Sequence, residues 1–339
     1  MRRPILALTM GDPAGIGPEI ILKAIASGKW DRRARLLIVG DQRIINRTAS
    51  WLGMTAPAFE FVDDPQDGLY EAKCITLLDM QNASPIDCPP GQLRPESGRA
   101  AVEYVNKACD LAMTGKVNAI VTAPVNKAAM HAAGFLFPGQ TELLASRTGT
   151  QKVTMLLASR KLRVVHISMH TSLREAIERV TFERVIETIR LADQACHSIG
   201  LRNPRIGVAG LNPHAGEDGL FGKEEMEIIH PAIKEACRGG LCVTGPWPPD
   251  TIFRDAVMGK HDIVVAMYHD QGHIPMKVLA FETGVNVSIG LPIIRTSVDH
   301  GTAFDIAGKG VAKIDSLQEA IRVALTMVRV QSFRTKPPP

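Results

Sequence analysis

A short apolar run, residues 263–266, is followed without a break by a strongly polar segment, Met267 to Lys277. A run this short predicts a strand that is buried on both faces, as strands of parallel sheets are. In open α/β sheets, functional side chains gather just beyond the carboxyl ends of such strands, where loops are free to carry them. The segment offers imidazole, carboxylate, amide and ammonium groups, so we expect a loop at a functional site.

The rest of the chain repeats this alternation of strands and helices. Further apolar runs predict strands at 5–9, 36–39, 74–78, 119–121, 205–210 and 285–291, with a β-hairpin formed by 153–158 and 162–168. Helices are predicted over 18–27, 97–117, 223–237 and 316–331. This order, with few aromatic residues, predicts an α/β fold. A length of 339 residues exceeds a usual single core, so we expect two lobes or one large unit.

Composition and charge argue against several classes of partner. The net charge is +4, and the chain has no Lys/Arg block or zinc-finger spacing, so we expect no nucleic-acid partner and favour small acidic molecules. No apolar run approaches membrane-spanning length, and the first one turns polar at Gly11, too early for a signal peptide. The six cysteines form no CxxC pair. A redox pair of Cys237 and Cys242 is the weaker alternative to reduced thiols in a cytoplasmic enzyme.

The first predicted strand leads into a glycine-rich segment, Gly11 to Glu19, that precedes a helix. A strand, a glycine-rich turn and a helix N-terminus together favour anion binding. The spacing is G-x-x-x-G-x-G, which matches neither the dinucleotide nor the P-loop pattern. A tight turn is therefore the favoured interpretation, and direct dinucleotide binding is the alternative.

Three histidines, His170, His214 and His269, each lie shortly after a predicted buried strand. Neighbouring parallel strands would bring these positions to one edge of the sheet, where three imidazoles can bind a catalytic divalent metal. Imidazole favours Zn²⁺ or Co²⁺ over Mg²⁺. Each histidine taken alone is more simply a loop residue.

Other side chains complete this candidate site. Asp270, Asp250 or Glu217 could orient the imidazoles as hydrogen-bond acceptors. Lys277, Arg295 and Lys127 are candidate clamps for a carboxylate or phosphate, with Asn286 as a possible donor, although each alone is more often a surface residue. His166 lies inside a predicted strand, so we expect a hydrogen-bonded core histidine.

Four strings carry a family resemblance: Met10 to Glu19, Leu211 to Gly216, Met267 to Gly272 and Leu291 to Thr302. They resemble the motifs of 4-hydroxythreonine-4-phosphate dehydrogenase, and the match runs nearly end to end. The stretch 300–310 also resembles the adenosine-binding loop of the isocitrate and isopropylmalate dehydrogenases. The resemblance implies a two-lobed α/β/α fold of that type. Its first lobe, on the cofactor side, would comprise 1–125 and 300–339, and its second, with the metal and dimer interface, 126–299.

The resemblance also implies roles for single residues. Metal ligands would be His170, His214 and His269, one of them supplied across a homodimer whose active site lies at the subunit interface. Substrate would be bound by Gln140, Thr141, Lys277, Asn286 and Arg295. NAD, bound without a Rossmann fingerprint, would contact His300, Gly301, Thr302, Ala303 and Asp305. Apart from the resemblance, we take Asp250, or a water that it holds, as the candidate catalytic base, with Lys277 as a second catalytic residue. The family has His where this chain has Gln140, which leaves the exact substrate open.

The implied activity is oxidative decarboxylation of a 4-phosphorylated four-carbon hydroxy acid, dependent on NAD and a divalent metal (Zn, Co or Mg). The substrate would be 4-hydroxy-L-threonine 4-phosphate, as in pyridoxine biosynthesis, or 4-phospho-D-threonate or -erythronate. Alternatives are a terephthalate cis-dihydrodiol dehydrogenase, a three-histidine metal hydrolase without NAD, and a non-catalytic anion-binding module. The sequence does not decide between NAD and NADP, and it does not identify the metal or the general base.

Overall fold

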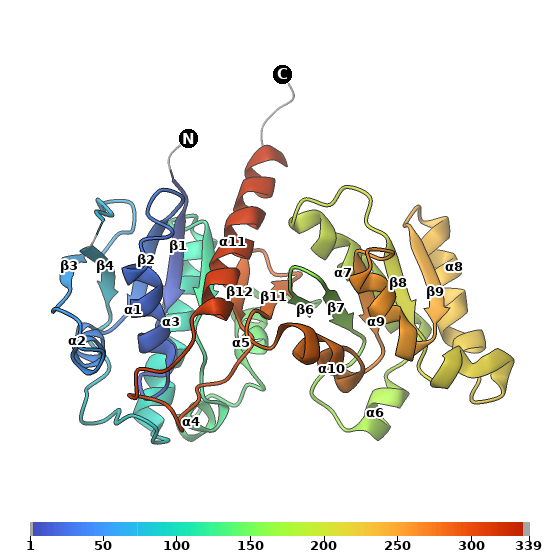
Figure 1. Cartoon of the computed structure of the whole chain (residues 1–339), viewed down its shortest axis with the longest axis horizontal. Helices are drawn as coiled ribbons and strands as arrows, with labels where there is room; N and C mark the ends of the chain where they lie inside the picture. Colours follow the sequence, from blue (N-terminus) through green and yellow to red (C-terminus); the bar gives the residue numbers. More distant parts are fainter. Residues whose placement is uncertain (1–2, 73, 335–339) are drawn as a thin grey trace. The chain divides into compact units, whose positions relative to one another are not determined.

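The computed structural model describes residues 3–72 and 74–334. The chain forms two compact units. The first comprises the described residues of Met1–Lys152 and Leu291–Ser332, and the second those of Val153–Gly290 and Phe333–Pro339. Each unit has its own helices and strands (Figure 1). The predicted α/β class is confirmed.

The first unit contains a fully parallel set of strands in the order β3-β4-β2-β1-β5-β12. The strands are β1 (Ile5–Thr9), β2 (Arg35–Gly40), β3 (Ala58–Phe61), β4 (Cys74–Asp79), β5 (Ala119–Thr122) and β12 (Arg295–Val298). The helices are α1 (Gly17–Ala26), α2 (Gln42–Trp51), α3 (Pro95–Met113), α4 (Lys127–Ala132), α5 (Gln140–Thr148) and α11 (Asp315–Arg334). Every residue of β1 and β5 is buried, as expected for central strands of a parallel sheet.

In the second unit the strand order is β11-β6-β7-β10-β8-β9, and β6 runs antiparallel to both of its neighbours. The strands are β6 (Thr154–Ala158), β7 (Arg163–His166), β8 (Ile206–Ala209), β9 (Val243–Trp247), β10 (Ile263–Ala266) and β11 (Val285–Ile289). The helices are α6 (Leu173–Glu178), α7 (Phe182–Ser198), α8 (His230–Arg238), α9 (Pro249–Val257) and α10 (His269–Ala280), with a π-helical turn, Glu225–Ile229, before α8. Three parallel strands, β7, β10 and β8, are adjacent, and Ala266 pairs with His166 in register. Their carboxyl ends therefore lie level at one edge.

The unit boundaries differ from those expected from the resemblance. The observed divisions fall at 152/153 and 290/291, whereas the expected ones fell at 125/126 and 299/300. The reason is packing: α4 and α5 both contact α3, and β12 pairs with β5. These contacts keep residues 126–152 and 291–299 in the first unit.

The polar segment after β10 is a helix rather than the expected loop. Helix α10 begins at His269, directly after an extended Tyr268. Its buried face is formed by Gly272, Met276 and Ala280, which recur every four residues, with Gln271 also buried. Asp250 lies in the first turn of α9, with Pro249 in the first helical position.

None of the described helices is both long and apolar enough to cross a membrane. All six cysteines have free thiols in the structure.

Gly98 permits the close approach of α3 to α4, and replacing it tests this packing. A Cβ at residue 98 would lie 2.1 Å from the Ala129 carbonyl oxygen and 2.7 Å from the Met130 nitrogen, both backbone atoms that cannot rotate away. Gly98→Ala should lower the free energy of unfolding by about 3 kcal/mol, the upper end of overpacking effects. Gly301→Ala is the control, because no atom lies within 4 Å of its added Cβ. Equal unfolding midpoints in urea for the two variants would contradict the packing argument.

Candidate functional site

The three histidines follow the ends of three adjacent strands of the second unit. His170 comes after β7, His269 opens α10 after β10, and His214 follows β8. The structure brings His170 and His269 together, with ring centroids 5.9 Å apart. His214 contacts Phe221, at 6.2 Å between ring centroids, and Glu217.

Two of these imidazoles are oriented by carboxylates. His269 Nδ1 lies 2.7 Å from Asp270 Oδ1, and His214 Nδ1 lies 2.7 Å from Glu217 Oε1. The hydrogen bond that His214 donates to Glu217 raises the pKa of His214, and the charge of Asp250 adds a smaller increase. When Nδ1 donates to a carboxylate, Nε2 is left as the lone-pair nitrogen, which is the usual arrangement of a metal-binding histidine.

These donors suit a divalent transition metal in their chemistry. Within residues 3–72 and 74–334, no group of three or more His, Cys, Asp or Glu side chains is placed to hold a metal ion. The predicted ligand set therefore comprises one close pair, His170 with His269, and a separate carboxylate-backed imidazole, His214.

The backbone that carries His214 has an unusual conformation. Residues 214–218 all have positive φ, and His214 itself has φ 53° and ψ 26°. L-residues avoid this left-handed region at a cost of about 1–2 kcal/mol each, and it occurs mainly as single residues. Only Gly216 in this run is free of that cost. We call residues 214–218 the left-handed turn; nothing in the local sequence pattern predicts it.

His166 lies beneath the pair of histidines as a fully buried residue at the end of β7. Its ring centroid is 4.7 Å from that of His273, which in turn stacks on His269 at 3.7 Å. Neither ring nitrogen of His166 has a hydrogen-bond partner, so the expected hydrogen-bonded core histidine is wrong on that point. Burial, and then the neighbouring His273, lower the pKa of His166 well below its ordinary value.

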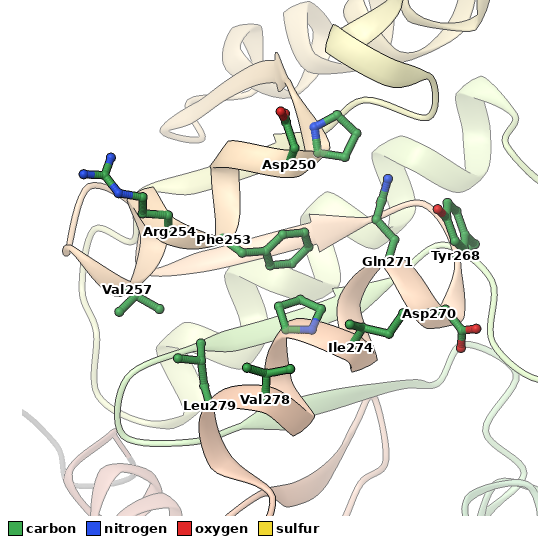
Figure 2. A pocket seen from close by; sticks show the side chains of 12 residues that line it. Asp250, Phe253, Arg254, Val257, Tyr268, Asp270, Gln271, Ile274, Val278 and Leu279 are labelled. Carbon is green, nitrogen blue, oxygen red and sulfur yellow. The ribbon is translucent and has the colours of Figure 1, made fainter.

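Residues of α9 and α10 line an open hollow of about 610 Å³ (Figure 2). Figure 2 shows Phe253 facing α10, from which Ile274, Val278 and Leu279 form an apolar wall. Asp250 and Asp270 line the same hollow and bring two carboxylates to it. The hollow thus combines an apolar wall with acidic side chains from the first turns of two helices.

The predicted substrate-binding residues fall in both units. Lys277 lies on α10 with its Nζ 5.4 Å from the ring centroid of Phe281, and Asn286 lies on β11 opposite Leu157. These two residues belong to the second unit, as do the three histidines. Gln140, Thr141 and Arg295 belong to the first unit.

Arg295 is a buried guanidinium at the start of β12. It donates to Thr122 Oγ1 at 2.8 Å and to Thr141 Oγ1 at 3.3 Å. Burial lowers its pKa to about 10, so the group remains charged at neutral pH. Beside it, Gln140 Nε2 donates to the Ala123 carbonyl at 3.1 Å, while its Oε1 is buried without a partner. The cluster thus presents a cation, hydroxyls and one unused acceptor.

The predicted cofactor residues form an irregular segment of the first unit. Its residues are His300, Gly301, Thr302, Ala303 and Asp305. The Thr302 carbonyl accepts from Ile16 N–H at 3.0 Å, and Ala303 has a positive φ of 44°. Lys23 of α1 donates to the carbonyls of Gly310 and Ala312 at 2.9 Å, which fixes the end of the segment.

The glycine-rich segment is the favoured tight turn. Gly15 N–H donates to the Asp12 carbonyl at 3.0 Å, Ala14 N–H to Asp12 Oδ1 at 2.8 Å, and Ile16 N–H to Thr302. Three N–H groups of the segment are therefore bonded within the protein. Asp12 is fully buried, and its Oδ2 has no hydrogen-bond partner. Desolvation raises the pKa of Asp12 to about 6, although the bond from Ala14 opposes the shift.

Comparison with known proteins shows long matches. The family model for the pyridoxal phosphate biosynthetic protein PdxA matches residues 32–324. A 4-hydroxythreonine-4-phosphate dehydrogenase of Desulfosudis oleivorans is 47% identical over 95% of this chain and 96% of that protein. A D-threonate 4-phosphate dehydrogenase of Pectobacterium atrosepticum is 45% identical over 95% of this chain and 99% of that protein.

Solved structures agree with the sequence comparison. A 4-hydroxythreonine-4-phosphate dehydrogenase from Klebsiella pneumoniae has a TM-score of 0.88 and 44% identity, covering 96% of this chain and 98% of that one. A terephthalate 1,2-cis-dihydrodiol dehydrogenase from Burkholderia xenovorans has a TM-score of 0.66 and 34% identity over 96% of this chain and 98% of that one.

The buried Asp12 makes stability depend on pH. Its pKa is about 6 in the folded state and about 3.8 when unfolded, so the folded state binds the proton more tightly. The resulting stability is present below pH 3.8 and is lost as the pH rises through about 6. Asp12→Asn mimics the protonated group, so wild type should lose about 2–3 kcal/mol of unfolding free energy relative to this variant between acidic and neutral pH. Urea denaturation at several pH values measures this, with exposed Asp63→Asn as control for one lost charge. A pH-independent difference would contradict the burial argument.

Proposed function

The chain belongs to the family of the pyridoxal phosphate biosynthetic protein PdxA. From that premise we propose that it catalyses the NAD-dependent oxidative decarboxylation of a 4-phosphorylated four-carbon hydroxy acid. The named proteins to which the chain is similar are dehydrogenases, so it is an oxidoreductase that acts on a hydroxyl group. The observation that carries the proposal is the set of imidazoles at adjacent strand ends, two of them backed by carboxylates.

Three histidines would hold the metal: His170, His214 and His269. The proposal is supported by the pairing of His170 with His269 and by the carboxylates that leave Nε2 of His214 and His269 as ligand atoms. When bound, a divalent metal supplies Lewis-acid stabilisation of developing negative charge, and NAD supplies the hydride acceptor. Zn²⁺ and Co²⁺ suit the nitrogen donors better than Mg²⁺ does.

Arg295 would bind an anionic group of the substrate, with the hydroxyls of Thr122 and Thr141 beside it. Its burial supports this role, because a desolvated guanidinium binds phosphate or carboxylate more strongly than an exposed one. Lys277 and Asn286 would hold a second polar group.

Asp250 would accept the proton of the substrate's hydroxyl. It is exposed at the first turn of α9, lines the hollow shared with α10, and acts electrostatically on His214. Oxidation of the hydroxyl gives a β-keto acid, whose carboxylate leaves as CO₂. His300, Gly301, Thr302, Ala303 and Asp305 would contact the cofactor.

The substrate within this class depends on Gln140. Its amide can accept a hydrogen bond but carries no charge, unlike the family's histidine when protonated. Similar proteins include both D-threonate 4-phosphate and 4-hydroxythreonine-4-phosphate dehydrogenases, so these are the two substrates to compare. The terephthalate diol is not favoured, because the structure of that name is less similar in fold and sequence.

We also propose a homodimer whose active site lies at the subunit interface. Helix α10 and the residue that follows it expose apolar side chains: Val278 is 81% exposed, Ile274 60% and Phe281, just after the helix, 71%. The same helix begins with His269, so a second copy covering that face would lie beside the proposed metal ligands. Monomeric proteins rarely expose such patches without a partner.

The six free thiols support action in the reducing cytoplasm. Recovery of the protein in a secreted fraction of its cells would contradict this part of the proposal.

The activity is tested by NADH formation from the two candidate phosphates, with Zn²⁺, Co²⁺ or Mg²⁺ added to metal-free protein. NADH should form only with metal, and His214→Ala should lower kcat/KM and metal affinity by at least about 100-fold while leaving the fold intact. Turnover without NAD would indicate the hydrolase instead, and binding without turnover the anion-binding module. Full metal occupancy in His214→Ala would remove this residue from the site.

The dimer is tested by placing a charge on the exposed face of α10. Val278→Asp should weaken dimerisation by about 100-fold, because a carboxylate would be buried against apolar atoms. Light scattering after gel filtration measures the mass of each variant. Ile86→Asp is the matched control, since Ile86 is 86% exposed in the first unit. A dimeric Val278→Asp would exclude this face from the interface.

A further inference from the structure

The left-handed turn that carries His214 depends on a buried carboxylate from another element. Glu225, at the start of the π-helical turn, is only 3% exposed. Its Oε1 accepts from Leu211 N–H at 2.7 Å and from Asn212 N–H at 2.8 Å, and its Oε2 accepts from Asn212 Nδ2 at 3.0 Å. One carboxylate thus binds three donors immediately before the turn.

The surroundings of Glu225 are shaped to receive it. A Cβ added at Gly216 would lie 2.7 Å from Glu225 Oε2, and one at Gly210 would lie 2.9 Å from Ala215 Cα. Side chains at either glycine would push the carboxylate or the turn out of place. The left-handed turn is therefore packed against Glu225 at Gly216 and against Gly210 at Ala215.

A second buried side chain joins this segment to the one that carries His269. Gln271, 8% exposed on α10, accepts from Met267 N–H at 2.7 Å through Oε1. Its Nε2 donates to the Gly210 carbonyl at 2.8 Å. These two bonds fix the orientation of the amide, because exchanging its oxygen and nitrogen would oppose like groups at both ends. Gln271 thereby connects the ends of β10 and β8.

We infer that Glu225 and Gln271 are positioning residues for the metal site, an inference that rests on the proposed function. Glu225 holds the strained turn in the conformation that presents His214. Gln271 fixes the segment that leads into His269 by bonding Met267 N–H and the Gly210 carbonyl. Neither side chain binds the metal. Both act through backbone groups of the segments that carry the ligands, whichever subunit supplies the third imidazole.

Two nearly isosteric substitutions remove specific bonds. Glu225→Gln keeps an acceptor for the two N–H groups but places an NH₂ group against the Asn212 amide donor. Gln271→Glu keeps the acceptor for Met267 N–H but opposes a carboxylate oxygen to the Gly210 carbonyl. Glu227→Gln is the control, since Glu227 is exposed on the same π-helical turn.

The measurement is titration of each metal-free variant with Co²⁺, following affinity and the visible absorption spectrum, together with amide hydrogen exchange over residues 211–221. Glu225→Gln and Gln271→Glu should bind Co²⁺ about 10–100-fold more weakly, with a changed spectrum, and Glu225→Gln should speed exchange in the turn. Glu227→Gln should match wild type. Circular dichroism checks folding, and if one variant fails to fold, the other still tests the inference.

His214→Ala separates this inference from the proposal beneath it. If His214→Ala binds Co²⁺ as wild type does, the proposed ligand set is wrong. If His214→Ala loses Co²⁺ while Glu225→Gln and Gln271→Glu keep wild-type affinity, spectrum and exchange, the ligand set stands and the positioning role is overturned.

Discussion

Backbone groups that lie beyond the last ladder bond of a buried strand need hydrogen-bond partners, and this requirement organises the histidine-bearing edge of the second unit. At this edge, side chains supply the missing hydrogen-bond partners. Ser168 donates to the Met267 carbonyl at 3.2 Å, Gln271 bonds both Met267 and Gly210, and Glu225 binds the two N–H groups that follow. Each bond that satisfies the backbone also ties one histidine-bearing segment in place, so stability and ligand geometry have the same source.

Much of this edge could be predicted from the sequence. The buried strands were visible as short apolar runs, and β7, β10 and β8 are adjacent and parallel as the argument required. The family suggested by the motifs is confirmed, as is the dehydrogenase class. Helix α10 was missed because a dense polar run and Pro275 obscured the four-residue repeat of its buried face. That repeat was the signal that could have revealed it.

Other features lay beyond any local pattern. Six successive residues with positive φ, 214 to 219, are stabilised by Glu225, which lies in a different element. The desolvation of Asp12 and Arg295 likewise arises only once distant segments have packed around them. The unpartnered ring nitrogens of His166 also depend on contacts between distant segments. One signal was present in the sequence: His273 follows His269 by four residues, which places the two rings on one face of a helix. Propensity and periodicity describe single segments and cannot specify such contacts.

The first unit is discontinuous in sequence, and this has a consequence during translation. Strand β5 gains its second neighbour, β12, only after residues 153–290 have been synthesised. The carbonyls of Gly310 and Ala312, to which Lys23 donates, are also made after that point. As the chain leaves the ribosome, the later-made unit has all of its strands first. Until then β5 presents an open edge to other nascent chains. The sheet of the first unit is thus completed after that of the second, and its open edge at β5 is where chaperone binding would matter most.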